Sequence, residues 1–185
     1  MSQEQPAEKK SRFQISREVQ EEFVNSVAEN MLALADAAGK WKKPWTADKP
    51  MGMPFCVATG RRYSGANVVK LMLTSLVNGL NDDRWMTFKQ FQQIQADHPA
   101  RDMKIKKGTK GVKLLRPEEI VFTVGADGKW QYLNDEQIKE IEAKKEQGLE
   151  TPDVQRRTLF YPFTVFCAAQ IEGFPPKESQ THAMT

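Results

Sequence analysis

The spacing of apolar residues predicts two helices in the first half of the chain. Apolar side chains recur every three or four positions over residues 15–38, and Gly39 follows them as a stop signal. The same period predicts a second helix over residues 66–77. Its buried stripe is predicted to consist of Val68, Val69, Met72 and Leu76.

Two further helices are indicated by the residues that begin them. Thr87 and Gln90 have the spacing of a capping box, which predicts a third helix. The apolar residues of this helix are Phe88, Phe91 and Ile94. Asn134 is a favourable N-cap for a charged helix over residues 135–147. Because that helix has few apolar residues, we expect it to lie loosely on the surface.

Runs of β-branched and aromatic residues bounded by turn residues predict the strands. A short strand with a turn is expected over residues 57–63, and a central, mostly apolar strand over residues 159–168. Two hairpins are expected before that last strand: residues 103–106 paired with 112–116 through Gly108 and Gly111, and residues 121–124 paired with 130–133. Helices and strands do not alternate as βαβ units. The sequence therefore predicts an α+β fold, with N-terminal helices packed on a small, mainly antiparallel sheet.

The 185 residues are divided by composition into one domain with two tails. Residues 1–14 are polar and without periodicity, so we predict a flexible arm, followed by a single domain over residues 15–175 and a flexible tail over 176–185. Within the domain, residues 117–157 are predicted to be an insertion that contains the second hairpin and the charged helix.

The net charge of +3 conceals a strong separation of charge along the chain. Residues 40–70 contain seven lysines and arginines against one aspartate, and residues 101–116 have the same balance. Residues 118–150 contain nine carboxylates against four lysines. Two basic stretches favour a polyanionic partner, and the acidic stretch is a candidate contact for host or conjugation proteins.

Signatures of catalysis are scarce, so we expect a binding module without a cofactor, a metal or catalytic residues. The two histidines lie in an expected loop and in the tail, and the chain lacks the spacings of zinc sites, phosphate-binding loops and nucleophile elbows. The two cysteines form no disulfide framework, which favours a cytoplasmic protein. The longest apolar run, residues 158–169, is too short to span a bilayer, so no membrane contact is expected.

Basic residues interleaved with aromatic residues point to single-stranded DNA as the partner. Single strands are bound by cations along the phosphates and by rings on which bases stack. The stacking candidates are Trp41, Trp45, Tyr63 and Trp85. The phosphate-binding candidates are Lys42, Lys43, Arg61, Arg62, Arg84, Lys106, Lys107, Lys110 and Lys113, and Asn67 is a candidate for a hydrogen bond to a base or sugar. Tyr63 and Trp85 have packing in the core as an alternative role, since tryptophan and tyrosine are often largely buried.

Five short blocks, taken in order, resemble one family. They are Lys43-Pro44-Trp45; Pro54 with Thr59-Gly60 and Tyr63-x-Gly65-x-Asn67; Arg84-Trp85-x-Thr87-Phe88-x-Gln90; Lys107-Gly108-x-Lys110-Gly111; and Val165-Phe166 with Gln170. Together they resemble the ArdC-type N-terminal domain of plasmid antirestriction proteins and conjugative, TraC-type primases. The resemblance implies sequence-nonspecific binding of single-stranded DNA in a plasmid or mobile-element protein, which can be transferred to a recipient cell with the DNA strand. Longer members carry a metallopeptidase-like or a primase domain after this one.

The sequence departs from that family pattern at Cys56 and Cys167, where the family usually has asparagine. We hypothesise that the two positions touch in the fold, so that one substitution accommodates the other. We expect two buried thiols, with a disulfide formed only after oxidation.

Two other functions remain open from the sequence. The first is a protein-interaction module that inhibits a host restriction or defence enzyme directly, through the acidic residues 118–150. The second is a cryptic nuclease or primase accessory, which would need carboxylates that converge on one site.

Overall fold

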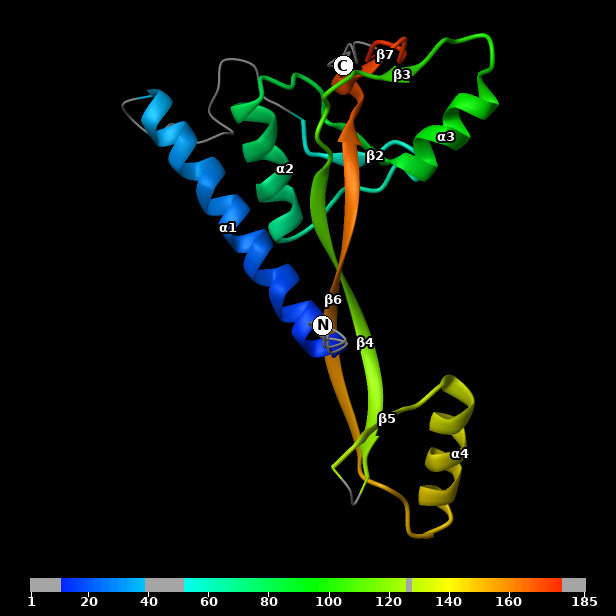
Figure 1. Cartoon of the computed structure of the whole chain (residues 1–185). Coiled ribbons are helices and arrows are strands. Elements are labelled where there is room, and N and C mark those ends of the chain that lie inside the picture. The colour runs from blue at the N-terminus through cyan, green and yellow to red at the C-terminus, as the bar shows by residue number, and fades with distance from the viewer. Residues whose placement is uncertain (1–10, 39–51, 126–127, 178–185) are drawn as a thin grey trace, which may run out of the picture. The chain divides into compact units, whose positions relative to one another are not determined.

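A computed structural model of the chain describes residues 11–38, 52–125 and 128–177 (Figure 1). The helices are α1 (Arg12–Ala38), α2 (Ala66–Val77), α3 (Phe88–Asp97), α4 (Asp135–Glu146) and the short 3-10 helix η2 (Ala168–Gln170). The strands are β1 (Phe55–Cys56), β2 (Arg84–Thr87), β3 (Lys104–Ile105), β4 (Val112–Val124), β5 (Trp130–Tyr132), β6 (Val154–Cys167) and β7 (Ile171–Glu172). The fold is α+β, as predicted.

The strands form two sheets. The larger one has the order β1-β2-β6-β4-β5, and β3 pairs with β7 in a separate two-stranded sheet. The pair β1/β2 is parallel, whereas β2/β6, β4/β5 and β3/β7 are antiparallel. β6 has two strands on each side and is therefore central, which confirms the prediction for the last long strand.

The chain divides into two compact units. The larger unit comprises Glu21–Leu115 and Pro162–Thr185, and the smaller unit comprises Met1–Gln20 and Arg116–Tyr161. The smaller unit contains residues 117–157, whose status as an insertion stays a prediction.

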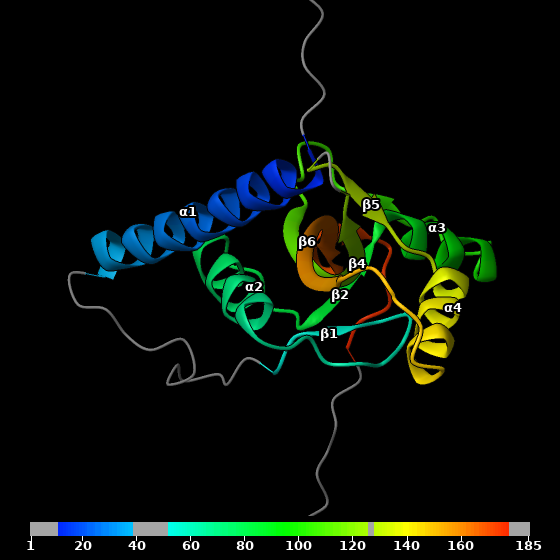
Figure 2. The ribbon, with the colours of Figure 1, turned by 90° about the horizontal axis from the view of Figure 1, so that it is seen from below.

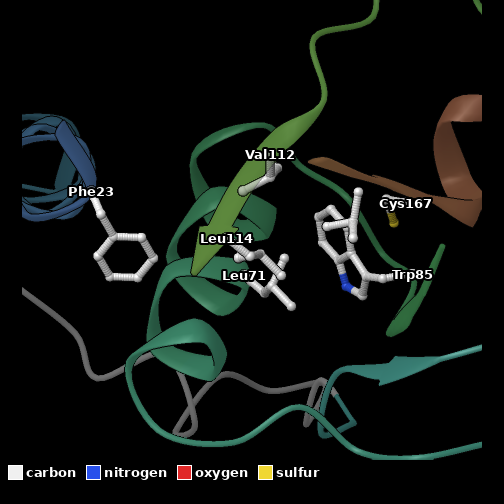
Figure 3. Close-up of a cluster of buried hydrophobic side chains, with 7 residues drawn as sticks. Phe23, Leu71, Trp85, Val112, Leu114 and Cys167 are labelled. Atoms are coloured by element: carbon white, nitrogen blue, oxygen red, sulfur yellow. The ribbon is translucent and has the colours of Figure 1, made fainter. Parts of the chain in front are cut away.

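The core of the larger unit lies where α1 and α2 meet the sheet. Phe23 of α1, Leu71 of α2 and Trp85 of β2 are buried there with residues of β4 and β6 (Figure 3). The next residue of β2, Met86, faces a second buried cluster that contains Phe91 of α3 and Ile171 of β7. Because successive residues of a strand point to opposite faces, β2 is buried on both sides.

The buried face of α2 differs from the predicted stripe. The helix has the predicted bounds, but its buried residues are Lys70, Leu71, Met72, Leu73 and Ser75, and Val69 is 48% exposed. Only Met72 of the predicted stripe is buried. α2 is apolar around most of its circumference, so its composition does not identify the side that faces the core.

The first predicted hairpin is wrong in its pairing. β3 and β4 exist near the expected positions, but β3 pairs with β7, through Lys104 opposite Glu172 and Ile105 opposite Ile171. β4 belongs to the larger sheet instead. A two-residue strand has almost no pattern of its own, so its partner is decided by the tertiary fold.

The smaller unit confirms the second hairpin. Phe122 of β4 pairs with Tyr132 of β5, and the Phe122 and Trp130 rings stack with centroids 4.3 Å apart. Phe13 packs edge-on against both rings. Phe13 lies in α1, which begins at Arg12 rather than at residue 15 because Ser11 and Gln14 exchange side-chain bonds to each other's backbone N–H. Asn134 and Gln137 form the same kind of capping box at the start of α4, which buries no residue.

Candidate nucleic-acid interface

A polar groove of about 660 Å³ lies between α1, α2 and the loop before β4, all within the larger unit. We call it the α1–α2 groove. Figure 2 shows the two helices side by side, and Asn30 of α1 donates to the hydroxyl of Thr74 of α2 at 3.1 Å. Its charged lining residues are Glu22, Glu29, Lys70, Lys110 and Lys113. The groove is therefore a place where polar and cationic groups from three elements converge.

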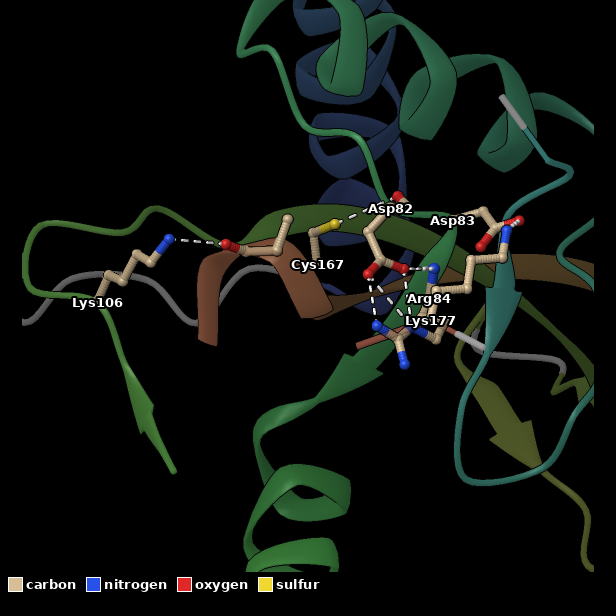
Figure 4. A network of polar contacts seen from close by, with 7 residues as sticks. Asp82, Asp83, Arg84, Lys106, Cys167 and Lys177 are labelled. Atoms are coloured by element: carbon tan, nitrogen blue, oxygen red, sulfur yellow. Dashed lines mark hydrogen bonds and ion pairs between the residues drawn. The ribbon is translucent and has the colours of Figure 1, made fainter. Parts of the chain in front are cut away.

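The loop that edges this groove, residues 106–111, is held at its start by a pair of bonds. We call it the glycine loop. The backbone N–H of Lys106 donates to the Gln170 carbonyl at 3.0 Å, and its ammonium donates to the Ala169 carbonyl at 3.0 Å (Figure 4). Thr109 then closes a turn by donating to the Lys106 carbonyl at 3.1 Å. The lysines of the loop are therefore presented from an anchored backbone.

Two glycines give this loop its conformation. Gly108 has a φ of +83°, which only glycine adopts without strain. Gly111 lies so close to β6 that a Cβ there would collide with the Thr164 methyl group and meet the Phe166 ring at 3.0 Å. Close contact with β6 thus requires glycine at position 111.

The lysines at this site differ in how far they are already neutralised. Lys113 forms an ion pair with Glu22 at 2.6 Å, and this contact lowers the pKa of the Glu22 carboxyl. Lys107 and Lys110 are exposed, and no hydrogen bond or ion pair to another described residue engages their ammonium groups. Lys107 and Lys110 therefore remain free to meet an anion.

Other predicted cations lie elsewhere. Arg61 and Arg62 are exposed after β1 and do not line the α1–α2 groove. Trp41, Lys42, Lys43 and Trp45 lie outside the described residues, so their predicted roles stay predictions.

Two predicted stacking residues belong to the core instead. Trp85 is completely buried in β2, so its ring offers no face to a base. Tyr63 is half-buried against the same cluster, and burial raises the pKa of its hydroxyl. Packing was the alternative role for both residues, and the structure adopts it, because Trp85 is buried in the cluster that contains Phe23 and Leu71 and Tyr63 packs against that cluster.

Two predicted polar contacts with DNA are engaged inside the protein. Asn67 binds the backbone of Leu115 in both directions: it donates to the carbonyl at 2.8 Å and accepts from the N–H at 3.0 Å. Arg84 makes a two-pronged pair with Asp82, with its shortest bond at 2.7 Å (Figure 4). Both side chains therefore serve the fold, and we withdraw them as DNA contacts.

The hypothesis that Cys56 and Cys167 touch is wrong. Cys56 pairs with Trp85 on one side, and Trp85 pairs with Cys167 on the other. The two cysteines are thus two strands apart, about 10 Å at ordinary strand spacing, which is too far for a disulfide. Both thiols are buried as expected, and burial raises the pKa of Cys167 to about 12.

Sequence reasoning missed the residues that shape the groove, above all Lys70. This lysine is only 5% exposed and belongs to the buried face of α2. A lysine between apolar neighbours gives no sign of that position in the sequence. Asn30, Thr74 and Gln170 also line the groove and were not singled out as site residues from the pattern.

The described residues were also compared with the requirements of a metal site and of a membrane-spanning helix. Within residues 11–38, 52–125 and 128–177, no three His, Cys, Asp or Glu side chains cluster closely enough to hold a metal ion. The helices of those same ranges include none with the length and apolar character needed to cross a bilayer.

Comparison with known proteins identifies the family. The model of the N-terminal domain of anti-restriction factor ArdC matches residues 17–166. Two DNA primases TraC from Escherichia coli are 32% identical over 164 residues and 30% identical over 171 residues. These matches cover 86% and 87% of this chain but only 10% and 14% of the primases.

A solved structure is also similar. The metal-free crystal structure of the antirestriction protein ArdC from plasmid R388 matches with a TM-score of 0.48 and 22% identity, over 83% of this chain and 42% of that one. Because the family model matches residues 17–166 of the 185, this chain belongs to the family of ArdC-type N-terminal domains.

Proposed function

We propose that this chain binds single-stranded DNA without strong sequence preference, and that the glycine loop and the α1–α2 groove form part of the binding surface. The observation that carries the proposal is the presence of free lysines on an anchored loop beside a polar groove. Ammonium groups meet phosphate as point charges, and phosphate contacts position a strand without reading its sequence. Binding by this surface is therefore nonspecific.

Preference for a single strand requires rings that stack on unpaired bases, at roughly 1–3 kcal/mol per base. Trp85 is excluded from this role by its burial, so we assign it to Trp41 and Trp45. Arg61 and Arg62, which are exposed, extend the cationic track in this proposal.

Family membership supports a role in a plasmid or mobile-element protein. The relatives named above are a DNA primase and an antirestriction protein, so we propose that this domain serves antirestriction or conjugative DNA transfer. In this proposal the domain acts in the cytoplasm by binding alone, and any catalysis belongs to other domains of longer relatives.

Fluorescence anisotropy tests the proposal, with a labelled oligonucleotide in single-stranded and duplex form over a series of salt concentrations. We expect tighter binding of the single strand and a linear fall of log K with log salt concentration, because phosphate contacts release counterions. If neither form binds at low salt, the proposal is wrong.

The smaller unit supports a second candidate function, an interaction with a host or conjugation protein. α4 carries five carboxylates, buries no residue and borders a pocket of about 440 Å³ with residues 151–156. A pull-down with host proteins tests this function. The partner should stay bound after nuclease treatment, and it should be lost when Glu136, Glu140 and Glu146 are changed to Gln. Retention by that variant would exclude α4 as the contact.

A further inference from the structure

Lys70 is a buried lysine whose ammonium group has no oxygen partner among the described residues. The residue is only 5% exposed, yet it lines the α1–α2 groove. Its ammonium nitrogen lies over the Phe23 ring, 4.4 Å from the ring centroid. Within the part of the chain that the structure describes, no oxygen accepts a hydrogen bond from this nitrogen, and no carboxylate lies within ion-pair distance of it.

This arrangement is costly for a residue that only fills space. The ammonium loses part of its hydration at the wall of the groove, and the Phe23 ring offsets this loss only in part, because its face offers no oxygen acceptor to the three N–H donors. Methionine has a similar length and would pack against Phe23 at no such cost. Burial accordingly lowers the pKa of Lys70, although Glu22 opposes the shift. The position therefore suits a lysine whose donors are completed by a ligand from the groove.

The surroundings of Lys70 favour an anion as that ligand. Lys110 and Lys113 line the same groove, so three lysines face two carboxylates, Glu22 and Glu29. Lys113 is held by Glu22 in an exposed pair at 2.6 Å. Exposed ion pairs contribute little to stability, so this one is readily exchanged for another anion.

We propose that Lys70 binds one backbone phosphate of single-stranded DNA at the floor of the α1–α2 groove, and that Lys113 exchanges Glu22 for the same phosphate. The proposal rests on the function proposed above and adds the position at which the strand is anchored. The groove, with a volume of about 660 Å³, is large enough to hold a phosphate group. Glu22 then acts as a built-in competitor that occupies Lys113 until DNA arrives.

The substitution Lys70→Met tests the role of the buried ammonium. The variant keeps the packing against Phe23 but removes the charge. We expect about tenfold weaker binding of a labelled oligonucleotide, as for removal of a charge-assisted hydrogen bond, and a salt dependence flatter by about 0.7. Lys139→Met removes one exposed lysine from α4 and should change neither quantity.

An abasic oligonucleotide and a second variant separate the outcomes. The weaker binding of Lys70→Met should persist on the abasic strand, because the phosphates of that strand remain. An effect that needs the bases would overturn the proposal.

Glu22→Gln, at an exposed position, should bind about threefold more tightly because it frees Lys113. Unchanged or weaker binding by Glu22→Gln would refute the exchange at Lys113. If Lys70→Met does not fold, Lys70→Gln removes the charge while keeping a polar side chain, and unchanged affinity of that variant would refute the site at Lys70.

The two proposals fail in different ways. If the unaltered protein binds the oligonucleotide but Lys70→Met has the same affinity and salt dependence, only the phosphate site at Lys70 is wrong. If the unaltered protein does not bind, the function proposed above is wrong as well.

Discussion

At the scale of residues, several polar side chains that resemble DNA contacts in the sequence hold the protein together instead. Asn67 and Arg84 both satisfy groups of their own fold, at Leu115 and Asp82. Asparagine and arginine suit either role, because their donors fit a backbone or a carboxylate as well as a nucleotide. Their role is decided by what lies within reach after folding, which residue type alone does not reveal.

Replacing Asn67 with alanine should destabilise the protein by about 2 kcal/mol, because the N–H and C=O of Leu115 both lose their partner in a half-buried place. Urea unfolding followed by circular dichroism measures the change. Asn25→Ala, at an exposed position of α1, should leave the midpoint nearly unchanged. An equal effect of both substitutions would contradict the proposed importance of the Leu115 bonds.

The Cys167 thiol should resist alkylation in the native protein. Its pKa is raised to about 12 by burial, so almost no thiolate exists at pH 8, and the thiolate is the reactive form. The pKa in the folded state lies above the ordinary value of 9.0, so this group should lower the stability of the fold as pH rises above about 9. Mass spectrometry after iodoacetamide treatment, with urea-unfolded protein as control, measures the protection. Rapid native labelling of Cys167 would argue against it.

At the scale of elements, long periodic segments were predicted well and short strands were not. The bounds of α2 agree with the prediction, and the capping box of α3 and the Asn134 N-cap of α4 are present as predicted. β2 was missed because it is four residues long and buried on both faces, which removes the alternation that marks a strand. The glycine loop was placed correctly in the sequence, but its anchor at Gln170 comes from a distant segment.

The substitution Gly111→Ala should displace the glycine loop. Its Cβ would overlap the Thr164 methyl group, at a cost of about 1–3 kcal/mol for an overpacked contact. Urea unfolding should show a smaller loss of stability when Thr164 is first changed to Ser, which removes that methyl group. A loss of equal size in both backgrounds would exclude the contact with Thr164 as the cause.

At the scale of the whole molecule, the small net charge does not reveal how positive and negative charges are distributed over the surface. Opposite charges are separated between the basic glycine loop of the larger unit and the acidic α4 of the smaller unit. The sequence predicted this separation, since charge patterning is local along the chain. It did not predict the α1–α2 groove, which requires three elements to come together.

Changing Lys106, Lys107 and Lys110 to glutamate should weaken binding for all oligonucleotide sequences alike. The slope of log K against log salt concentration should fall by about 1.4, at roughly 0.7 for each of Lys107 and Lys110, because the Lys106 ammonium is engaged by the Ala169 carbonyl. Anisotropy with oligonucleotides of different composition measures both effects. Glutamate at Lys139, Lys144 and Lys145 reverses the same amount of charge on α4 and provides the control. If both triple variants lose affinity equally, total charge rather than the glycine loop governs binding.

The boundary between the two units crosses β4 after Leu115 and β6 after Tyr161, and this constrains how relatives can differ in length. Adding one residue to a strand reverses the direction of every side chain beyond it. An odd insertion in β4 would therefore turn Ile120 and Phe122 out of their cluster. We expect insertions and deletions among related proteins to avoid both strands and to collect in the loop between α4 and β6, where Gly148 has a positive φ just after the end of α4.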